Sequence, residues 1–124
     1  MKTATILLAF ISTAWAGCYT TGDDFQNKDN ARFNAQRACE GYDGNAGAFQ
    51  GTFAPGEAKS VCVQGTTTQK YNMVVQNLNL DSSFDLADAD CTLRLHNEIN
   101  GCDKGGESDV AGWHFRVDPN NGIC

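Results

Sequence analysis

Two side chains with useful chemistry, His114 and Arg116, lie two positions apart near the end of the chain. A guanidinium donates several hydrogen bonds, and an imidazole donates or accepts them. The two residues alternate with Trp113, Phe115 and Val117, and such alternation is typical of a strand with one buried and one exposed face. We therefore expect the apolar set, Trp113 included, to face the core and the polar pair to face solvent or a ligand.

A second polar row precedes this one. Asn72 and Gln76 alternate with apolar side chains along residues 71–76, so we expect them on the exposed face of another strand. A shallow patch of amide and guanidinium groups is suited to hydrogen-bonding the hydroxyls of a sugar. An ordinary solvated sheet face accounts for the same pattern equally well. The predicted glycan-binding residues are His114, Arg116, Asn72 and Gln76.

Catalytic and metal sites are not indicated by the sequence. A histidine ribonuclease of the small fungal type needs two histidines, a Glu and an Arg on one sheet face. Here His96 falls on a predicted helix, and no predicted strand offers a well-placed Glu. A G-x-S-x-G motif is absent, and so is a C-x-x-C pair, while the two histidines are not spaced as zinc ligands. We therefore predict a non-catalytic protein without a metal or cofactor.

Two clusters of oxygen-bearing side chains have simpler explanations than cation binding. Residues 81–90 contain four aspartates but lack the glycine and the bidentate glutamate of a calcium loop. Aspartates at the start of a helix are favoured by its dipole, which is our prediction for this segment. Residues 118–122, Asp-Pro-Asn-Asn-Gly, have the composition of a turn.

The elements that must position these residues begin with a helix over residues 28–40. Asn27 is a suitable N-cap, and Gly41 is a suitable C-cap. One face of this helix is made of small residues, which would let it lie close to a neighbouring element. These residues are Ala31, Ala35, Ala38 and Cys39.

The middle of the chain predicts strands over residues 49–53, around 61–63 and over 71–79, separated by turns at 54–57 and 64–69. A second helix is expected from just after Ser83 to Asn100, with Ser82 and Asp85 as a capping box. Residues 103–109 are expected to form a loop, and 110–118 a last strand. The predicted fold class is α+β, with an antiparallel sheet of four or five strands and two packed helices.

The N-terminus has the layout of a secretory signal peptide. A positive start is followed by an apolar run and by small residues ending in Ala14-Trp15-Ala16. We predict a signal peptide over residues 1–16 and a single domain over 17–124, which is secreted and extracellular. The six cysteines all follow the predicted cleavage site and indicate three disulfides. Their pairing stays open, although Cys91 and Cys102 are expected to bridge the second helix twice.

The formal net charge is −6 at pH 7. An acidic chain repels phosphate backbones, so nucleic-acid binding is not expected. No basic amphipathic face indicates a membrane surface, and the apolar run is too short to span a bilayer.

The end of the chain carries a resemblance. The segments GGES (105–108) and GWHFRVDPNNGIC (112–124) resemble the ending of small secreted fungal glycan-binding proteins similar to an ink-cap mushroom lectin, the Y-three-like family. The signal peptide, the early Cys18, the helix bearing Cys39 and the pair Cys91 and Cys102 agree in outline. The resemblance implies an α-β-α sandwich with an antiparallel sheet, a homodimer joined through sheet edges, and glycan binding without cleavage.

The function expected from the sequence is therefore that of a secreted, non-catalytic lectin, with glycans or glycoproteins as partners. One alternative is a secreted effector or elicitor that binds a host protein, for which small size, disulfides and acidity are equally suitable. An exposed apolar patch near the helices would favour it. A small secreted ribonuclease-like protein is the third hypothesis.

Overall fold

The computed structural model describes residues 16–124. The predicted signal peptide lies outside the described residues except for Ala16, the first residue of β1. In chain order the elements are β1 (Ala16–Cys18), α2 (Lys28–Glu40), β2 (Thr52–Phe53), β3 (Ala58–Gln64), β4 (Gln69–Asn77), β5 (Phe84–Asp85), α3 (Asp88–Gly101), β6 (Gly106–Val110) and β7 (Trp113–Asn121).

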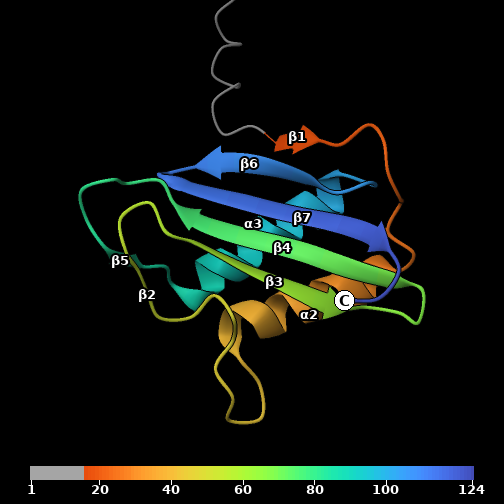
Figure 1. The fold of residues 1–124 in the computed structure, drawn as a ribbon, viewed down its shortest axis with the longest axis horizontal. Helices are drawn as coiled ribbons and strands as arrows, with labels where there is room; N and C mark the ends of the chain where they lie inside the picture. Colours follow the sequence, from red (N-terminus) through yellow and green to blue (C-terminus); the bar gives the residue numbers. More distant parts are fainter. Residues whose placement is uncertain (1–15) are drawn as a thin grey trace, which may run out of the picture.

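Five of the strands form one antiparallel sheet in the order β1-β6-β7-β4-β3. The two nine-residue strands, β4 and β7, pair at its centre, and the small strands β2 and β5 pair separately. Both helices lie behind the large sheet in Figure 1. The predicted α+β class, the antiparallel sheet and the two packed helices are confirmed.

The arrangement of layers differs from an α-β-α sandwich, because both helices cover the same face of the sheet (Figure 1). The disulfide between Cys39 of α2 and Cys91 of α3 joins them side by side. The reason lies in β4, whose residues alternate between buried and half-buried. Tyr71, Met73 and Val75 form its buried row, and the opposite row is mainly polar. Only one face of the sheet is therefore apolar enough to bury helices.

The first helix, α2, begins and ends where the sequence predicts. The Asn27 side chain accepts a hydrogen bond from the Asn30 backbone N–H (3.0 Å), which satisfies one of the free donors of the first turn. Gly41 follows the last turn with φ 78°, a conformation that favours glycine. The predicted face of small residues, Ala31, Ala35, Ala38 and Cys39, is buried.

The second helix, α3, starts at Asp88, so the prediction of a helix from Ser83 and of a Ser82–Asp85 capping box is wrong. Residues 84–85 form β5, which pairs with β2. The Asn77 side-chain amide donates to the Ser82 carbonyl (2.9 Å) and holds the approach to β5 in place. Tertiary contacts thus outweigh the local capping signal, whose expected gain is only about 1 kcal/mol.

The C-terminal third contains two strands where one was expected. Residues 106–109, predicted to be part of a loop, form β6 together with Val110. The strand predicted to begin at Val110 instead begins at Trp113 as β7, after a turn at Ala111 and Gly112 with φ 53° and 86°. The predicted turn at 118–122 is mostly strand, because β7 continues to Asn121. Pro119 is tolerated there because β6 ends at Gly106, opposite Val117. The missing N–H of Pro119 therefore lies beyond the end of that neighbouring strand.

The predicted strand over 49–53 is also corrected. Only Thr52 and Phe53 form a strand, β2. Phe49 lies in a turn before it, where its side chain is buried and its backbone N–H donates to the Ala38 carbonyl (3.0 Å) near the end of α2. The predicted strand over 71–79 is confirmed as β4, which ends at Asn77.

Three disulfides are present: Cys18–Cys102, Cys39–Cys91 and Cys62–Cys124. The expected double bridging of the second helix is confirmed, because Cys91 and Cys102 lie at its two ends. Among the described residues, no helix has the length and apolar composition needed to cross a membrane. A domain with three disulfides is compatible with secretion.

Candidate functional site

The face of the sheet away from the helices is polar, and no helix within residues 16–124 covers it (Figure 1). We call this the open face. Directly opposite residues of an antiparallel pair share one face, so the register places Asn72 beside Asp118 and Gln76 beside His114. The strands β3, β4, β6 and β7 contribute the following residues to the open face: Ala58, Ser60, Cys62, Gln64, Lys70, Asn72, Val74, Gln76, Glu107, Asp109, His114, Arg116, Asp118 and Asn120. All four predicted glycan-binding residues lie on it.

A chain of hydrogen bonds fixes Arg116 at the centre of the open face. Its Nε–H donates to the Tyr19 hydroxyl (2.7 Å), and its Nη2 donates to Asp118 Oδ2 (2.9 Å). The Tyr19 hydroxyl donates in turn to Glu107 Oε2 (3.0 Å). The hydrogen bond to Tyr19 raises the pKa of Arg116, while partial burial raises the pKa of Tyr19. The Arg116 guanidinium is therefore a permanently charged donor whose position is fixed by its hydrogen bonds to Tyr19 and Asp118.

His114 lies between two carboxylates. Its Nε2 is 3.2 Å from Glu107 Oε1, and its Nδ1 is 2.6 Å from Asp109 Oδ1. Glu107 comes from β6, so the expectation that no strand places a Glu beside His114 and Arg116 is wrong. Both ring nitrogens are occupied, and no space for a phosphate separates Glu107 from His114. Acid–base cleavage of a phosphodiester needs its base and its acid on opposite sides of the phosphate, so the arrangement is better suited to holding strands together.

Two shallow hollows flank the row Arg116, Asp118 and Asn120 on β7. The first has a volume of about 420 Å³ and lies towards β3 and β4, with Asn72 in its lining. The second has a volume of about 480 Å³ and lies towards the segment after β1, with Tyr19 in its lining. The Asn120 amide donates to Asn72 Oδ1 (2.8 Å). Donors and acceptors thus alternate along this row, with an aromatic ring on one side.

The predicted residues do not all converge on these hollows. Arg116 and Asn72 line the first hollow. Gln76 instead donates to the Gly56 carbonyl (3.1 Å), so it anchors a turn at the end of the sheet. His114 lines neither hollow. Sequence reasoning missed Tyr19 and Asn120; continued alternation after Arg116 was the available signal for Asn120, and no local signal places Tyr19.

A buried carboxyl group lies beneath the open face. The Glu98 side chain, on α3, is 2 % exposed and accepts a hydrogen bond from the Ser108 hydroxyl of β6. Its other oxygen, Oε1, has no partner among the described residues. Burial raises the pKa of Glu98 above its ordinary value of 4.5, with Glu107 adding to the increase and the Ser108 hydrogen bond and His114 opposing it.

Because the pKa of Glu98 is raised in the folded state, we expect the unfolding free energy of the protein to fall as the pH rises. The folded state favours the protonated Glu98, so between the unfolded and folded pKa values it binds more protons than the unfolded state, and the unfolding free energy falls with rising pH. We expect the stability of Glu98→Gln relative to the wild type to increase progressively as the pH rises above 4.5, the ordinary pKa of a glutamate. Denaturant unfolding at several pH values measures this difference.

A second variant separates the carboxyl effect from a general change in packing. Ser108→Ala removes the one hydrogen bond to Glu98, so it should steepen the loss of stability with pH and cost about 1–3 kcal/mol at the alkaline end. A stability difference between wild type and Glu98→Gln that stays constant with pH contradicts the account.

The fold and the open face define a class of protein: a disulfide-linked α+β domain whose sheet exposes a polar, hollowed face. Comparison with protein-family models, with curated proteins and with solved structures finds no match for the chain. Within residues 16–124 no group of three His, Cys, Asp or Glu side chains is arranged to hold a metal ion.

Proposed function

We propose that this protein is a secreted, non-catalytic lectin whose open face binds a glycan epitope. The observation that carries the proposal is the row Arg116, Asp118 and Asn120, flanked by two hollows. A guanidinium, a carboxylate and an amide supply donors and acceptors in alternation, which suits neighbouring sugar hydroxyls. The Tyr19 ring at the second hollow is suited to contact the apolar face of a sugar.

The site supports binding rather than cleavage. The ionisable groups around Arg116 are all paired. Arg116 donates to Asp118 and to Tyr19, and Glu107 accepts from Tyr19 and pairs with His114. Groups that are held in this way offer a fixed hydrogen-bonding surface. The resemblance to fungal lectins at residues 105–124 points in the same direction.

We also propose that two copies join through the free edge of β3. The Asn77 N–H bonds the Glu57 carbonyl, and the Gly65 N–H bonds the Gln69 carbonyl. Glu57 and Gly65 therefore direct their backbone groups towards β4. Because successive residues of a strand direct their N–H and C=O groups to opposite sides, residues 59, 61 and 63 also direct theirs towards β4. Those of residues 58, 60, 62 and 64 therefore face outward, and β3 is an edge strand able to pair with a second copy.

The dimer has a specific test. Ser60→Pro removes an outward-facing N–H without removing a hydrogen bond to β4, so we expect it to convert a dimer to a monomer in sedimentation equilibrium. The control variant Lys59→Ala should remain a dimer, because the backbone groups of residue 59 face β4 and not the free edge. A wild type that is monomeric at all concentrations contradicts the edge-to-edge dimer.

The lectin proposal is tested on a glycan array with oxidised protein spanning residues 17–124. We expect selective binding to a set of glycans that share one terminal epitope. The double variant Asn72→Ala/Arg116→Gln, shown to be folded by its thermal melt, should lose that binding. Absence of binding by the folded wild type contradicts the proposal.

One observation favours the second candidate, an effector that binds a host protein. Each helix exposes one large apolar side chain, Phe33 of α2 (56 %) and Leu93 of α3 (50 %). Exposed apolar side chains indicate a protein-binding surface where they lie together in one patch. Under this alternative, the double variant Phe33→Glu/Leu93→Glu abolishes biological activity, whereas the open-face variant Asn72→Ala/Arg116→Gln retains it.

The ribonuclease hypothesis has a direct assay. We expect wild-type protein to leave single-stranded RNA intact over hours, with His114→Ala as the control for contaminating nuclease. Cleavage by the wild type that disappears in His114→Ala would establish catalysis and contradict the non-catalytic proposal.

A further inference from the structure

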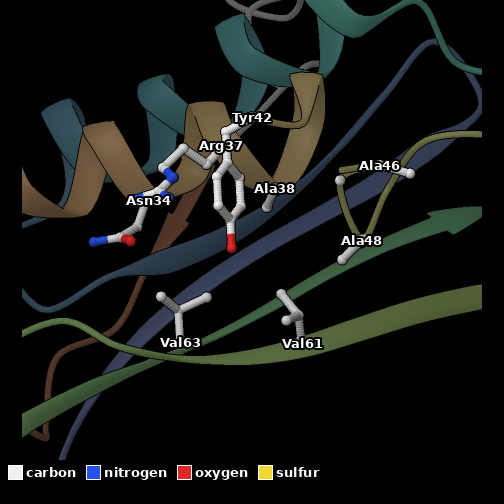
Figure 2. Close-up of a pocket in the computed structure, with 9 residues that line it drawn as sticks. Asn34, Arg37, Ala38, Tyr42, Ala46, Ala48, Val61 and Val63 are labelled. Atoms are coloured by element: carbon white, nitrogen blue, oxygen red, sulfur yellow. The ribbon is translucent and has the colours of Figure 1, made fainter. Parts of the chain in front are cut away.

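A separate hollow lies on the helical side of the sheet, between α2, the loop that follows it and β3 (Figure 2). Its volume is about 280 Å³, just below the usual range for small-molecule sites, about 300–1,000 Å³. The side chains of Val61 and Val63 rise from β3 on one side, and Ala48 closes another (Figure 2). The lining is therefore mainly apolar, with Asn34, Arg37 and Tyr42 as its polar members.

The loop that closes this hollow is held in place. Its tip is a tight turn in which Asp43 and Gly44 have φ of 49° and 79°, and Tyr42 and Asn45 exchange backbone hydrogen bonds of 3.1 and 2.8 Å. A Cβ on Gly47 would lie 2.3 Å from the Ala38 carbonyl oxygen, so only glycine permits this close approach to α2.

Further hydrogen bonds tie the loop to the helix end. The Gln50 side chain accepts from the Gly47 N–H (2.7 Å) and donates to the Glu40 carbonyl (3.2 Å). These contacts fix the loop against the end of α2 before any ligand arrives, and a preformed site loses less entropy on binding.

The hollow contains a positive charge without a counter-ion. The Arg37 guanidinium stacks over the Tyr42 ring, 3.5 Å from its centroid, and forms no ion pair or side-chain hydrogen bond with any of residues 16–124. The Tyr42 hydroxyl is likewise unpartnered within that range and points towards β3 (Figure 2). Stacking holds the guanidinium flat and leaves its N–H edge available, the arrangement in which arginine binds a carboxylate through two bonds.

We propose that this hollow binds a small carboxylate with a compact apolar body, such as an arylalkanoate. The carboxylate pairs with Arg37 and accepts a hydrogen bond from the Tyr42 hydroxyl, while the apolar part packs on Val61, Val63 and Ala48. The limited volume restricts the ligand to a single ring or a short chain. The site lies on the opposite side of the sheet from the open face, so this binding is independent of the proposed lectin activity.

The test uses 3-phenylpropionate and its neutral counterpart 3-phenylpropan-1-ol as probes in amide-shift titrations of ¹⁵N-labelled protein spanning residues 17–124. We expect saturable shifts confined to residues 37–48 and 61–63 with the carboxylate, and affinity at least about tenfold weaker for the alcohol, the factor expected for a charge-assisted hydrogen bond. Arg37→Gln should weaken carboxylate binding by a similar factor.

Substitutions that fill the hollow with a larger side chain provide a second test, which does not depend on charge. Ala48→Leu and Val63→Phe should each abolish binding of 3-phenylpropionate while their amide spectra remain those of a folded protein. Ala48 is exposed, so a larger side chain there should not disturb the core. Ala48→Leu therefore still tests the proposal if Val63→Phe fails to fold.

Three outcomes overturn the proposal. The first is no saturable shift with 3-phenylpropionate, and the second is equal binding of the acid and the alcohol. The third is a shift of the amides of residues 37–48 with protein concentration alone, which would assign the hollow to contact with a second copy. Residues 61–63 are left out of this comparison because they lie on β3, the edge proposed to pair in the dimer. Glycan binding by Ala48→Leu should equal that of the wild type, so failure here is distinguishable from failure of the lectin proposal.

Discussion

Replacing both cysteines of the Cys39–Cys91 bridge with alanine is expected to lower the unfolding free energy by about 5 kcal/mol. The bridge closes a loop with a sequence separation of 52, for which loop entropy in the unfolded chain gives about 4 kcal/mol. Both sulfurs are buried between the helices, and the space they leave adds about 1 kcal/mol or more. Since a whole domain is stable by about 5–15 kcal/mol, much of the variant should be unfolded at physiological temperature.

A matched control separates the two contributions. Cys62–Cys124 closes a loop of similar length, with a sequence separation of 62, but both of its cysteines are exposed. The variant Cys62→Ala/Cys124→Ala should therefore lose about 4 kcal/mol from the same entropic cause, with no cavity. Denaturant unfolding measures both values, and an equal or larger loss for the exposed bridge would contradict the packing account.

The second large effect is expected for Arg116→Gln, which should weaken binding of the array-selected glycan by at least about tenfold. The substitution removes charge-assisted donors, each of which contributes about 1.5–3 kcal/mol to binding, and it leaves the Asp118 carboxylate without its partner. The midpoint of the thermal melt should fall only modestly, because the Arg116 and Asp118 side chains remain partly exposed, 35 % and 21 %, and ion pairs at the surface contribute only about 0–1 kcal/mol. Isothermal titration measures the affinity.

Two controls test whether the effect is specific to the hollows. Lys70→Gln removes the same charge from β4 but from a side chain that lines neither hollow, so affinity should change by less than about twofold. Gln76→Ala should also keep its affinity, because Gln76 anchors the Gly56 carbonyl. A loss for Lys70→Gln equal to that for Arg116→Gln would indicate net charge rather than the site.

Local signals were sufficient to predict α2 and β4. Asn27, Gly41 and the alanine face of α2 each act within a turn or two of the chain. In β4 the apolar residues Tyr71, Met73 and Val75 recur at every second position, with Val74 as the one apolar residue on the opposite row. These elements combine favourable local chemistry with a consistent apolar face, so propensity and packing agree.

The elements that could not be predicted depend on partners distant in sequence. Residues 106–110, Gly-Glu-Ser-Asp-Val, have weak strand propensity and become β6 by pairing with β1 and β7. Residues 118–121 have turn chemistry but are strand, because β4 pairs with them as far as Asn121. Tertiary hydrogen bonding outweighs local preference in both segments.

The site was predictable only in part for the same reason. Alternation placed Arg116 and Asn72 on one face, and the register of β4 and β7 brings them together. Tyr19 reaches Arg116 from 97 positions away, because β1 pairs with β6 and the Cys18–Cys102 bridge fastens that end. Neither the disulfide pairing nor the strand order follows from local sequence, so this side of the site becomes visible only in the folded chain.

The central claim is that glycans bind the open face, and amide-shift mapping with the array-selected glycan tests it most directly. Titrating that glycan into ¹⁵N-labelled protein spanning residues 17–124 should shift the amides of β4, of β7 from Arg116 to Asn120, and of residues 18–22, with the helical layer unchanged. Shifts confined to α2, α3 or the loop over residues 42–48 would place the glycan elsewhere and contradict the account.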